Sequence, residues 1–445
     1  MHLASATRRD LTVRAAVEQA LITEDQPIAA LLDVDSVRAS AAALRAAFEE
    51  VAAPGQPLLH AFAVKAAALV PVLRLLADNG LGAEVASPGE LALAQAAGIG
   101  PDRTVLDSPA KTPAELRTAL DLGVAVNADS QQELARLDAL VGAAPLRSAV
   151  GLRINPQLGS GSIDAMSTAT ATSKFGIALR DPGAREWLVR AYADRPWLTR
   201  LHAHSGSQGI PLDLMAAGVK DAYELAEEIN GAVGRQQIDT LDIGGGLPVN
   251  FASESTEPTF HDYAQLLSAQ VPGLFDGRYG LVTEFGRSLL AKAGTIVARV
   301  EYTKSAGGRP IAVTHAGAQI AARTVFAPDA WPVRIGVYGP QGLPKQGAPI
   351  AQDVAGPCCF AGDLVGRERA LPGLEAGDLV ALLDTGAYYF SNPFGYNSLP
   401  RPGVYGYWAS GDGTVRFATV RRPQTLDQIV TESGAGQRDA LTPPC

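Results

Sequence analysis

Eight short apolar runs that alternate with helical patterns are the feature of this sequence that most constrains its fold. Helical patterns such as "PGELALAQAAG" and "SQQELARLDALVG" separate the runs, and several begin at Ser, Thr or Pro and close on Gly. Strands that alternate with helices eight times are typical of an α/β fold of the (β/α)8 TIM-barrel type, and a doubly wound sheet is the alternative. The runs lie at 58–64, 81–86, 103–107, 123–127, 149–154, 200–205, 239–243 and 281–285.

The C-terminal part of the chain has a different pattern, which predicts a second domain. Runs such as "GTIVARVEYTKS" and "GDLVALLD" are separated by Gly, Pro and Asn turns and show little helical periodicity. We expect a β-rich barrel or sandwich over residues 294–430, completed by the N-terminal segment 1–35 through its apolar run at 28–35. The predicted barrel covers residues 36–293, and residues 431–445 are predicted to form a loose tail.

Composition excludes several classes of function. The net charge is −9 and no basic cluster occurs, which argues against a nucleic-acid partner. No apolar run has the length of a membrane span, and the N-terminus lacks the apolar core of a signal peptide. Cys358, Cys359 and Cys445 form no metal-binding or disulfide pattern, so we expect no metal site and a reducing, cytoplasmic location.

Polar residues follow four of the predicted strands at the point where each strand ends. Lys65 ends the first strand, His204 the sixth and Glu284 the eighth, and glycines 244–246 follow the seventh. Each has an ordinary explanation by itself, such as a solvated strand end or a core histidine. In a (β/α)8 barrel, however, the reacting groups stand at the C-terminal strand ends. The shared position therefore predicts one active site.

Pyridoxal 5′-phosphate catalysis uses this set of groups. A lysine can bind the cofactor as a Schiff base, and a carboxylate beside the pyridine nitrogen keeps that nitrogen protonated, which makes the ring a strong electron sink. Glycine amides can cradle a phosphate because no side chain blocks their approach. A dinucleotide-binding loop at "DIGGGLP" is excluded because the GxGxxG pattern is not satisfied.

A series of short motifs runs through most of the chain. They are "FAVKA" (62–66), "GAEVASPGEL" (82–91), "SKFGI" (173–177), "HAHSGSQ" (202–208), "LDIGGGLP" (241–248), "EFGRSLLAKAG" (284–294), "GPCCFAGD" (356–363), "DTGAYYFS" (384–391) and "GYNSLPRP" (395–402). Together these motifs resemble the fold-type III decarboxylases that use pyridoxal 5′-phosphate, the group of diaminopimelate, ornithine and arginine decarboxylases, and most closely the diaminopimelate branch. The resemblance implies an amino-acid decarboxylase.

The resemblance also implies a role for each matching residue. Lys65 matches the Schiff-base lysine, His204 the residue stacked on the cofactor ring and Glu284 the partner of the pyridinium nitrogen. Cys359 matches a cysteine that the family inserts from the neighbouring subunit, where it acts as the acid on the substrate carbon. The resemblance therefore implies a homodimer with shared active sites. The positions that hold the phosphate or lie beside it are matched by Ser207, Gly244, Gly245, Gly246, Arg287 and Tyr388.

The substrate-binding positions of the family are matched by Arg287, Arg323, Phe360 and Tyr396. The diaminopimelate enzymes have a glutamate where Phe360 stands, and that glutamate meets the distal ammonium group. A phenyl ring cannot form this salt bridge, and an ammonium buried without a partner is costly. Arg323 matches the arginine for the distal carboxylate. We therefore expect an amino acid whose far end is acidic or acylated, or a larger conjugate from siderophore or antibiotic biosynthesis.

Three alternatives to this function remain open. A meso-diaminopimelate decarboxylase of lysine biosynthesis is possible if another acid supplies the distal contact. A racemase or epimerase on the same barrel is disfavoured, because alanine racemases put an arginine where Glu284 stands. A non-catalytic regulator would be expected to have lost Lys65, which is present.

Overall fold

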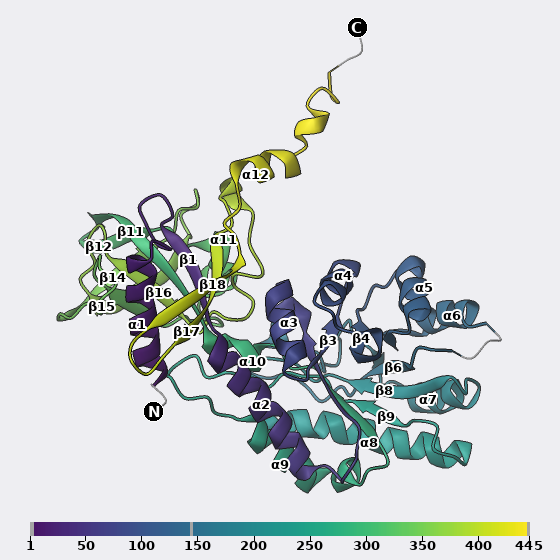
Figure 1. Cartoon of the computed structure of the whole chain (residues 1–445). Helices are drawn as coiled ribbons and strands as arrows, with labels where there is room; N and C mark the ends of the chain where they lie inside the picture. Colours follow the sequence, from purple (N-terminus) through teal and green to yellow (C-terminus); the bar gives the residue numbers. More distant parts are fainter. Residues whose placement is uncertain (1–3, 143–145, 443–445) are drawn as a thin grey trace. The chain divides into compact units, whose positions relative to one another are not determined.

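The chain divides into two compact units. The computed structural model describes residues 4–142 and 146–442 (Figure 1). The barrel unit comprises residues 36–250 and 255–291. The β unit comprises residues 1–35, 251–254 and 292–445, so it collects segments from both ends of the chain.

Eight parallel strands close the barrel unit. Each strand pairs with its neighbours along the chain, and the last, β10, pairs with the first, β2, through Leu281 and Leu58. This closure confirms the barrel and excludes the doubly wound sheet. The short strand β7 (Ile177–Ala178) adds to β6 outside the ring. The eight strands are β2 (Leu58–Ala63), β3 (Gly82–Val85), β4 (Thr104–Asp107), β5 (Ala125–Ala128), β6 (Val150–Asn155), β8 (Leu198–Ala203), β9 (Thr240–Asp242) and β10 (Gly280–Thr283).

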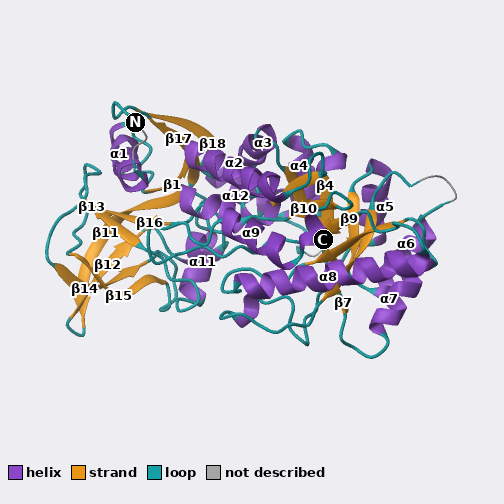
Figure 2. Ribbon diagram, turned by 90° about the horizontal axis from the view of Figure 1, so that it is seen from below, coloured by secondary structure: helices purple, strands orange, loops and turns teal. Residues whose placement is uncertain are grey.

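Helices surround these strands, as Figure 2 shows. Their starts follow the capping chemistry of the sequence: Ser87 caps α4, and Thr112 forms a capping box with Glu115 at the start of α5. Among the described residues, no helix combines the length and apolarity needed to cross a membrane. The helices are α2 (Val34–Val51), α3 (Val70–Asp78), α4 (Pro88–Ala96), α5 (Pro113–Leu122), α6 (Gln131–Leu140), α7 (Ala184–Ala193), α8 (Leu212–Val233), α9 (Phe260–Gln270) and α10 (Arg287–Leu290).

The β unit is built on one nine-stranded sheet. Its early strand β1 (Ile28–Asp33) pairs antiparallel with β11 and parallel with β17, which confirms that the N-terminal run completes the β-rich part. Val13, Val297 and Ala381 are among the residues of its buried core. The other strands are β11 (Gly294–Ala306), β12 (Arg309–Thr314), β13 (Ile335–Tyr338), β14 (Pro349–Ala355), β15 (Leu364–Pro372), β16 (Leu379–Leu383), β17 (Gly403–Ala409) and β18 (Val415–Arg421).

Three helices of the β unit differ from the sequence expectations. The first, α1 (Ser5–Glu18), buries Val13 and Ala16, and the second, α11 (Ala318–Phe326), follows β12. The third, α12 (Leu426–Glu432), starts at a capping box and extends into the segment predicted as a loose tail. A further helical turn, η7, covers Ala435–Gln437, while Cys445 and the end of the predicted tail lie outside the described residues.

Candidate active site

The residues and the glycine loop predicted at strand ends follow four neighbouring strands, at one rim of the barrel. Lys65 is in the 3-10 turn η1 (Val64–Ala66) directly after β2, and His204 directly follows β8. Gly244 to Gly246 follow β9, and Glu284 directly follows β10. The strands β8, β9, β10 and β2 are consecutive neighbours in the barrel sheet, and parallel strands all end at the same rim.

A buried carboxylate holds Lys65. Its Nζ lies 2.6 Å from Oε2 of Glu84, and the lysine side chain is 47% exposed whereas that of Glu84 is 0% exposed. Burial raises the pKa of Glu84, and the ammonium of Lys65 offsets only part of this rise. The pair therefore keeps a reactive amine at the rim, beside a carboxylate that can take up a proton.

His204 is fixed as a neutral ring. Gly245 N–H donates a hydrogen bond to its Nδ1 at 3.1 Å, so Nδ1 carries no proton. Burial lowers the pKa of His204 well below its usual range, and the cations of Arg153 and His202 lower it further. A neutral, flat ring whose orientation is set by a backbone amide is suited to stacking on a planar ligand.

The glycine loop needs its glycines for space and for backbone conformation. Gly244 and Gly246 have φ angles of +65° and +103°, in the region that favours glycine. A Cβ on Gly246 would lie 1.9 Å from the carbonyl oxygen of Gly206, and one on Gly245 would lie 2.1 Å from that of Glu284. The loop therefore packs directly against the turn that carries Ser207 and against the end of β10.

Glu284 is a buried carboxyl group with an open hydrogen-bonding position. Its Oε1 has no hydrogen-bond partner among the described residues. Burial and the carboxylate of Asp242 raise the pKa of Glu284 well above its usual range, although His202 counteracts them. Arg287, at the start of α10, is also buried.

A buried charge network below this rim was not predicted from the sequence. His202 is fully buried, with Nε2 3.2 Å from Oδ2 of Asp107 and Nδ1 3.2 Å from Oδ1 of Asp242. Asp107 also pairs with Arg153 at 3.0 Å, and Asp242 pairs with Arg200 at 3.2 Å. The barrel interior is thus polar at this level, where such barrels commonly have branched apolar side chains.

The sequence contains a signal for this network. In "RLHAH", residues 200–204, Arg200 and His202 of β8 and His204 directly after it alternate with the apolar Leu201 and Ala203. Alternate residues point to one face of a strand, so all three face the barrel interior. Polar residues with period two in a buried barrel strand therefore predict a polar interior.

The remaining predicted site residues belong to the β unit. Cys359 is exposed, its backbone N–H donates to Oδ1 of Asn397 at 2.8 Å, and Tyr396 donates to its carbonyl oxygen at 3.3 Å. The guanidinium carbon of Arg323 lies 4.2 Å from the ring centre of Tyr388. Tyr388 has a φ angle of +65°, an uncommon conformation for an aromatic residue.

Phe360 belongs to a four-ring cluster, formed by Phe326, Phe360, Phe394 and Tyr396. Phe326 stacks on Phe360 with ring centres 5.5 Å apart, and Phe394 stacks on Tyr396 at 5.8 Å. Edge contacts at 5.2 and 5.6 Å join the two stacks into a closed set. Phe326 is 60% exposed, so the cluster presents an apolar surface beside Cys359.

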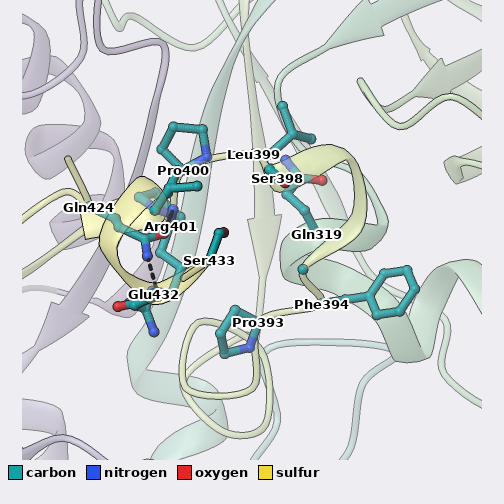
Figure 3. A pocket seen from close by; sticks show the side chains of 13 residues that line it. Gln319, Pro393, Phe394, Ser398, Leu399, Pro400, Arg401, Gln424, Glu432 and Ser433 are labelled. Carbon is teal, nitrogen blue, oxygen red and sulfur yellow. Dashed lines mark hydrogen bonds and ion pairs between the residues drawn. The ribbon is translucent and has the colours of Figure 1, made fainter. Parts of the chain in front are cut away.

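Phe394 of the cluster also lines a pocket of about 300 Å³ in the same unit (Figure 3). The loop that contains Pro393 and Phe394 forms one wall, and α12 forms another through Ile429 and Glu432. Arg401 pairs with Glu432 at 3.2 Å, and Gln424 donates to the same carboxylate at 3.0 Å. The charged groups of this pocket are therefore paired with one another.

Comparisons with known proteins identify relatives over most of the chain. The protein named diaminopimelate decarboxylase from Pseudomonas aeruginosa is 32% identical to this chain, and the match covers 84% of this chain and 86% of the relative. The protein of the same name from Pseudomonas fluorescens is 33% identical, and the match covers 85% of this chain and 87% of the relative. The crystal structure of diaminopimelate decarboxylase from Helicobacter pylori complexed with L-lysine superposes with a TM-score of 0.79 at 26% identity. That match covers 94% of this chain and 99% of the other.

The barrel itself matches a family model. The model is described as "Pyridoxal-dependent decarboxylase, pyridoxal binding domain", and its match covers residues 35–291. This range contains Lys65, His204, the glycine loop and Glu284, the groups that the structure gathers on one rim. The chain therefore belongs to the family of pyridoxal-dependent decarboxylases.

Proposed function

We propose that this pyridoxal 5′-phosphate-dependent carboxy-lyase removes the α-carboxyl group of a diaminopimelate-type amino acid, with meso-diaminopimelate as the first candidate. The names of the relatives support this substrate class. The observation that carries the reaction is Oε1 of Glu284, a buried oxygen without a hydrogen-bond partner among the described residues. A protonated pyridine nitrogen would supply the missing donor.

The other groups on the rim also fit this cofactor. Lys65 provides the amine for its covalent attachment, and the neutral ring of His204 provides a stacking surface. The glycine loop and Ser207 provide backbone and hydroxyl donors for its phosphate, and Arg287 provides a cation. The bound cofactor supplies an electron sink for the pair of electrons left on the α-carbon when carbon dioxide leaves.

The chain's own residues then act on protons. Glu284 holds the proton between its Oε1 and the ring nitrogen, and Glu84 holds the proton of the Lys65 amine. Cys359, whose thiol is exposed, returns a proton to the α-carbon after carbon dioxide has left. Arg323 and Tyr396 bind the distal part of the substrate.

The function is tested by measuring carbon dioxide release from meso-diaminopimelate, lysine, ornithine, and acidic or acylated amino acids. We expect release from meso-diaminopimelate or an analogue of it, and a decarboxylated product in the mass spectrum. Racemisation of the substrate without carbon dioxide release would overturn the proposal.

A second candidate is the same reaction on an amino acid without a distal ammonium group. It is favoured by Phe360, which lies in the four-ring cluster and carries no charge. A distal carboxylate or acyl group would still find Arg323, whose guanidinium lies over two aromatic rings in the β unit. The acidic and acylated members of the panel distinguish the two candidates.

Phe360→Glu is expected to raise kcat/KM for meso-diaminopimelate by about one to two decades, because one charge-assisted contact to an ammonium is worth about 1.5–3 kcal/mol. Phe360→Gln is the matched control, since it removes the ring without adding a charge. The measurement is the ratio of kcat/KM for meso-diaminopimelate to that for an acidic analogue. A wild type that already prefers meso-diaminopimelate, with a variant that loses this preference, would contradict the interpretation of Phe360 as the mark of a substrate without a distal ammonium group.

We also propose a homodimer in which Cys359 completes the site of the partner subunit. Mixing inactive Lys65→Ala with inactive Cys359→Ala subunits should then restore activity, to roughly a quarter of the wild-type value for random reassortment of two-fold dimers. Cys358→Ala provides the control, because the Cys358 thiol is buried and its sulfur lies 3.7 Å from Oε1 of Gln319. The Cys358→Ala variant should be active by itself. No recovery after mixing would place both residues in the site of one chain.

A further inference from the structure

His202 occupies an unusual position for a histidine that no step of the proposed reaction uses. Its ring is fully buried, and both ring nitrogens lie 3.2 Å from a carboxylate oxygen. Neither contact has hydrogen-bond geometry, but a neutral imidazole carries one N–H only and would leave the lone pair of its other nitrogen beside the second carboxylate. The geometry therefore favours the imidazolium, in which both nitrogens carry a proton.

Strand register explains why these groups meet. On β8, His202 stands opposite Arg153 of β6 and opposite Asp242 of β9. Asp107 at the end of β4 and Glu284 after β10 complete the surroundings, and the polar atoms of Asp107, His202 and Glu284 all lie within 4.8 Å of one another. The histidine thus lies within 4.8 Å of the carboxyl group assigned to the cofactor ring, close enough for a strong electrostatic interaction in a buried site.

When Glu284 is ionised, the charges around His202 nearly cancel only if His202 is protonated. Asp107 and Asp242 are paired with Arg153 and Arg200, which leaves Glu284 without an arginine or lysine partner in the described residues. Of the other charged groups of the barrel, two lysines have carboxylate partners of their own, and Asp129 shares Arg153 with Asp107. The pairs are Lys65 with Glu84 at 2.6 Å, Lys111 with Glu133 at 2.9 Å, and Asp129 with Arg153 at 3.9 Å.

We propose that His202 is a positioning residue, whose imidazolium, held between Asp107 and Asp242, balances the charge of Glu284 and so lets this carboxylate hold the ring nitrogen of the cofactor. This inference rests on the role proposed for Glu284. Burial alone would lower the pKa of His202, but Asp242 and Asp107 raise it well above the usual range, in agreement with the geometry. Without the imidazolium, an ionised Glu284 would be an excess buried anion.

The first test uses the protein without cofactor or substrate. In a 15N-histidine NMR spectrum we expect one imidazole whose two nitrogens both stay protonated at pH values well above the ordinary histidine pKa of about 6.5. His202→Asn should remove this signal. His60→Asn is the matched control, because His60 is also buried in the barrel but its Nδ1 contacts the hydroxyl of Thr283, and its ring pairs with no carboxylate in the part of the chain that the structure describes. A wild-type spectrum without a persistent imidazolium would overturn the proposal, whether or not the variants fold.

The second test uses the loaded enzyme. His202→Asn should lower kcat by about 10-fold to 100-fold, the usual effect of a residue that acts through another, with a smaller change in KM. The absorbance of the bound cofactor should titrate at a lower pH than in the wild type, because the ring nitrogen loses its proton more readily. Asp107→Asn combined with His202→Asn removes one negative and one positive charge, and this double variant should regain most of the lost kcat.

The outcomes separate a charge role from a structural one. Recovery in the double variant supports charge balance, whereas a further loss of kcat and an unchanged absorbance titration would mean that His202 only packs. A different substrate would leave the NMR and absorbance results unchanged. If Glu284→Gln also leaves the absorbance titration unchanged, Glu284 is not the partner of the ring nitrogen and the proposed function loses that assignment. The NMR signal of a persistent imidazolium at His202 would be unaffected by that result.

Discussion

Lys65→Ala is expected to abolish turnover, by roughly three decades or more, because it removes the amine to which the cofactor attaches. The barrel should stay folded, since the lysine side chain is 47% exposed and contributes little packing. Borohydride reduction of the loaded wild type should fix the cofactor to the peptide that contains Lys65, and mass spectrometry of the digest identifies this peptide.

Lys220→Ala is a suitable control for this experiment. Lys220 lies on α8 with its side chain 54% exposed, and its carboxylate neighbour Glu224 is 3.9 Å away. This variant should keep both the cofactor adduct and the activity. A reduced adduct on any lysine other than Lys65 would show that the attachment site has been assigned to the wrong strand end.

Glu284→Gln is expected to lower kcat by about two to three decades, the usual loss when one buried electrostatic partner of the reacting system is removed. Glutamine has nearly the same shape but cannot hold the negative charge that keeps the ring nitrogen protonated. Glu284→Asp keeps the charge and should lose less. The measurement is kcat together with the absorbance of the bound cofactor, and an unchanged kcat in Glu284→Gln would remove Glu284 from this role.

The barrel could be predicted from the sequence because its strands are short, buried on both faces and bounded by turn residues. The run predicted at 58–64, for example, became β2 (Leu58–Ala63). The helix α1 could not be predicted in the same way, because its segment "SATRRDLTVRAAVE" has weak amphipathic patterning. Its helical state depends on Val13 and Ala16, which pack against the sheet of the β unit.

The site could be predicted only where residues follow strand ends. This rule places Lys65, His204 and Glu284 at the rim. Asp107 closes β4 and His202 lies within β8, and the importance of both depends on their pairing. Register between distant strands decides which carboxylate meets which cation, and one sequence does not contain that register. The four-ring cluster has the same origin, since Phe326 and Phe360 meet only because α11 and the loop after β14 pack together.

The strand β1 has a consequence for the order in which the chain can fold during synthesis. Its two partners, β11 and β17, begin at Gly294 and Gly403, and Leu31 stands opposite both Thr295 and Tyr405. The N-terminal strand therefore leaves the ribosome long before either partner exists, while the barrel strands between 58 and 283 become available in order. Pairing across such sequence distances is slow because the loop-closure entropy must be overcome first. The barrel can thus form while translation continues. Until the last strands have been synthesised, β1 stays an unpaired strand that chaperones or another chain can bind.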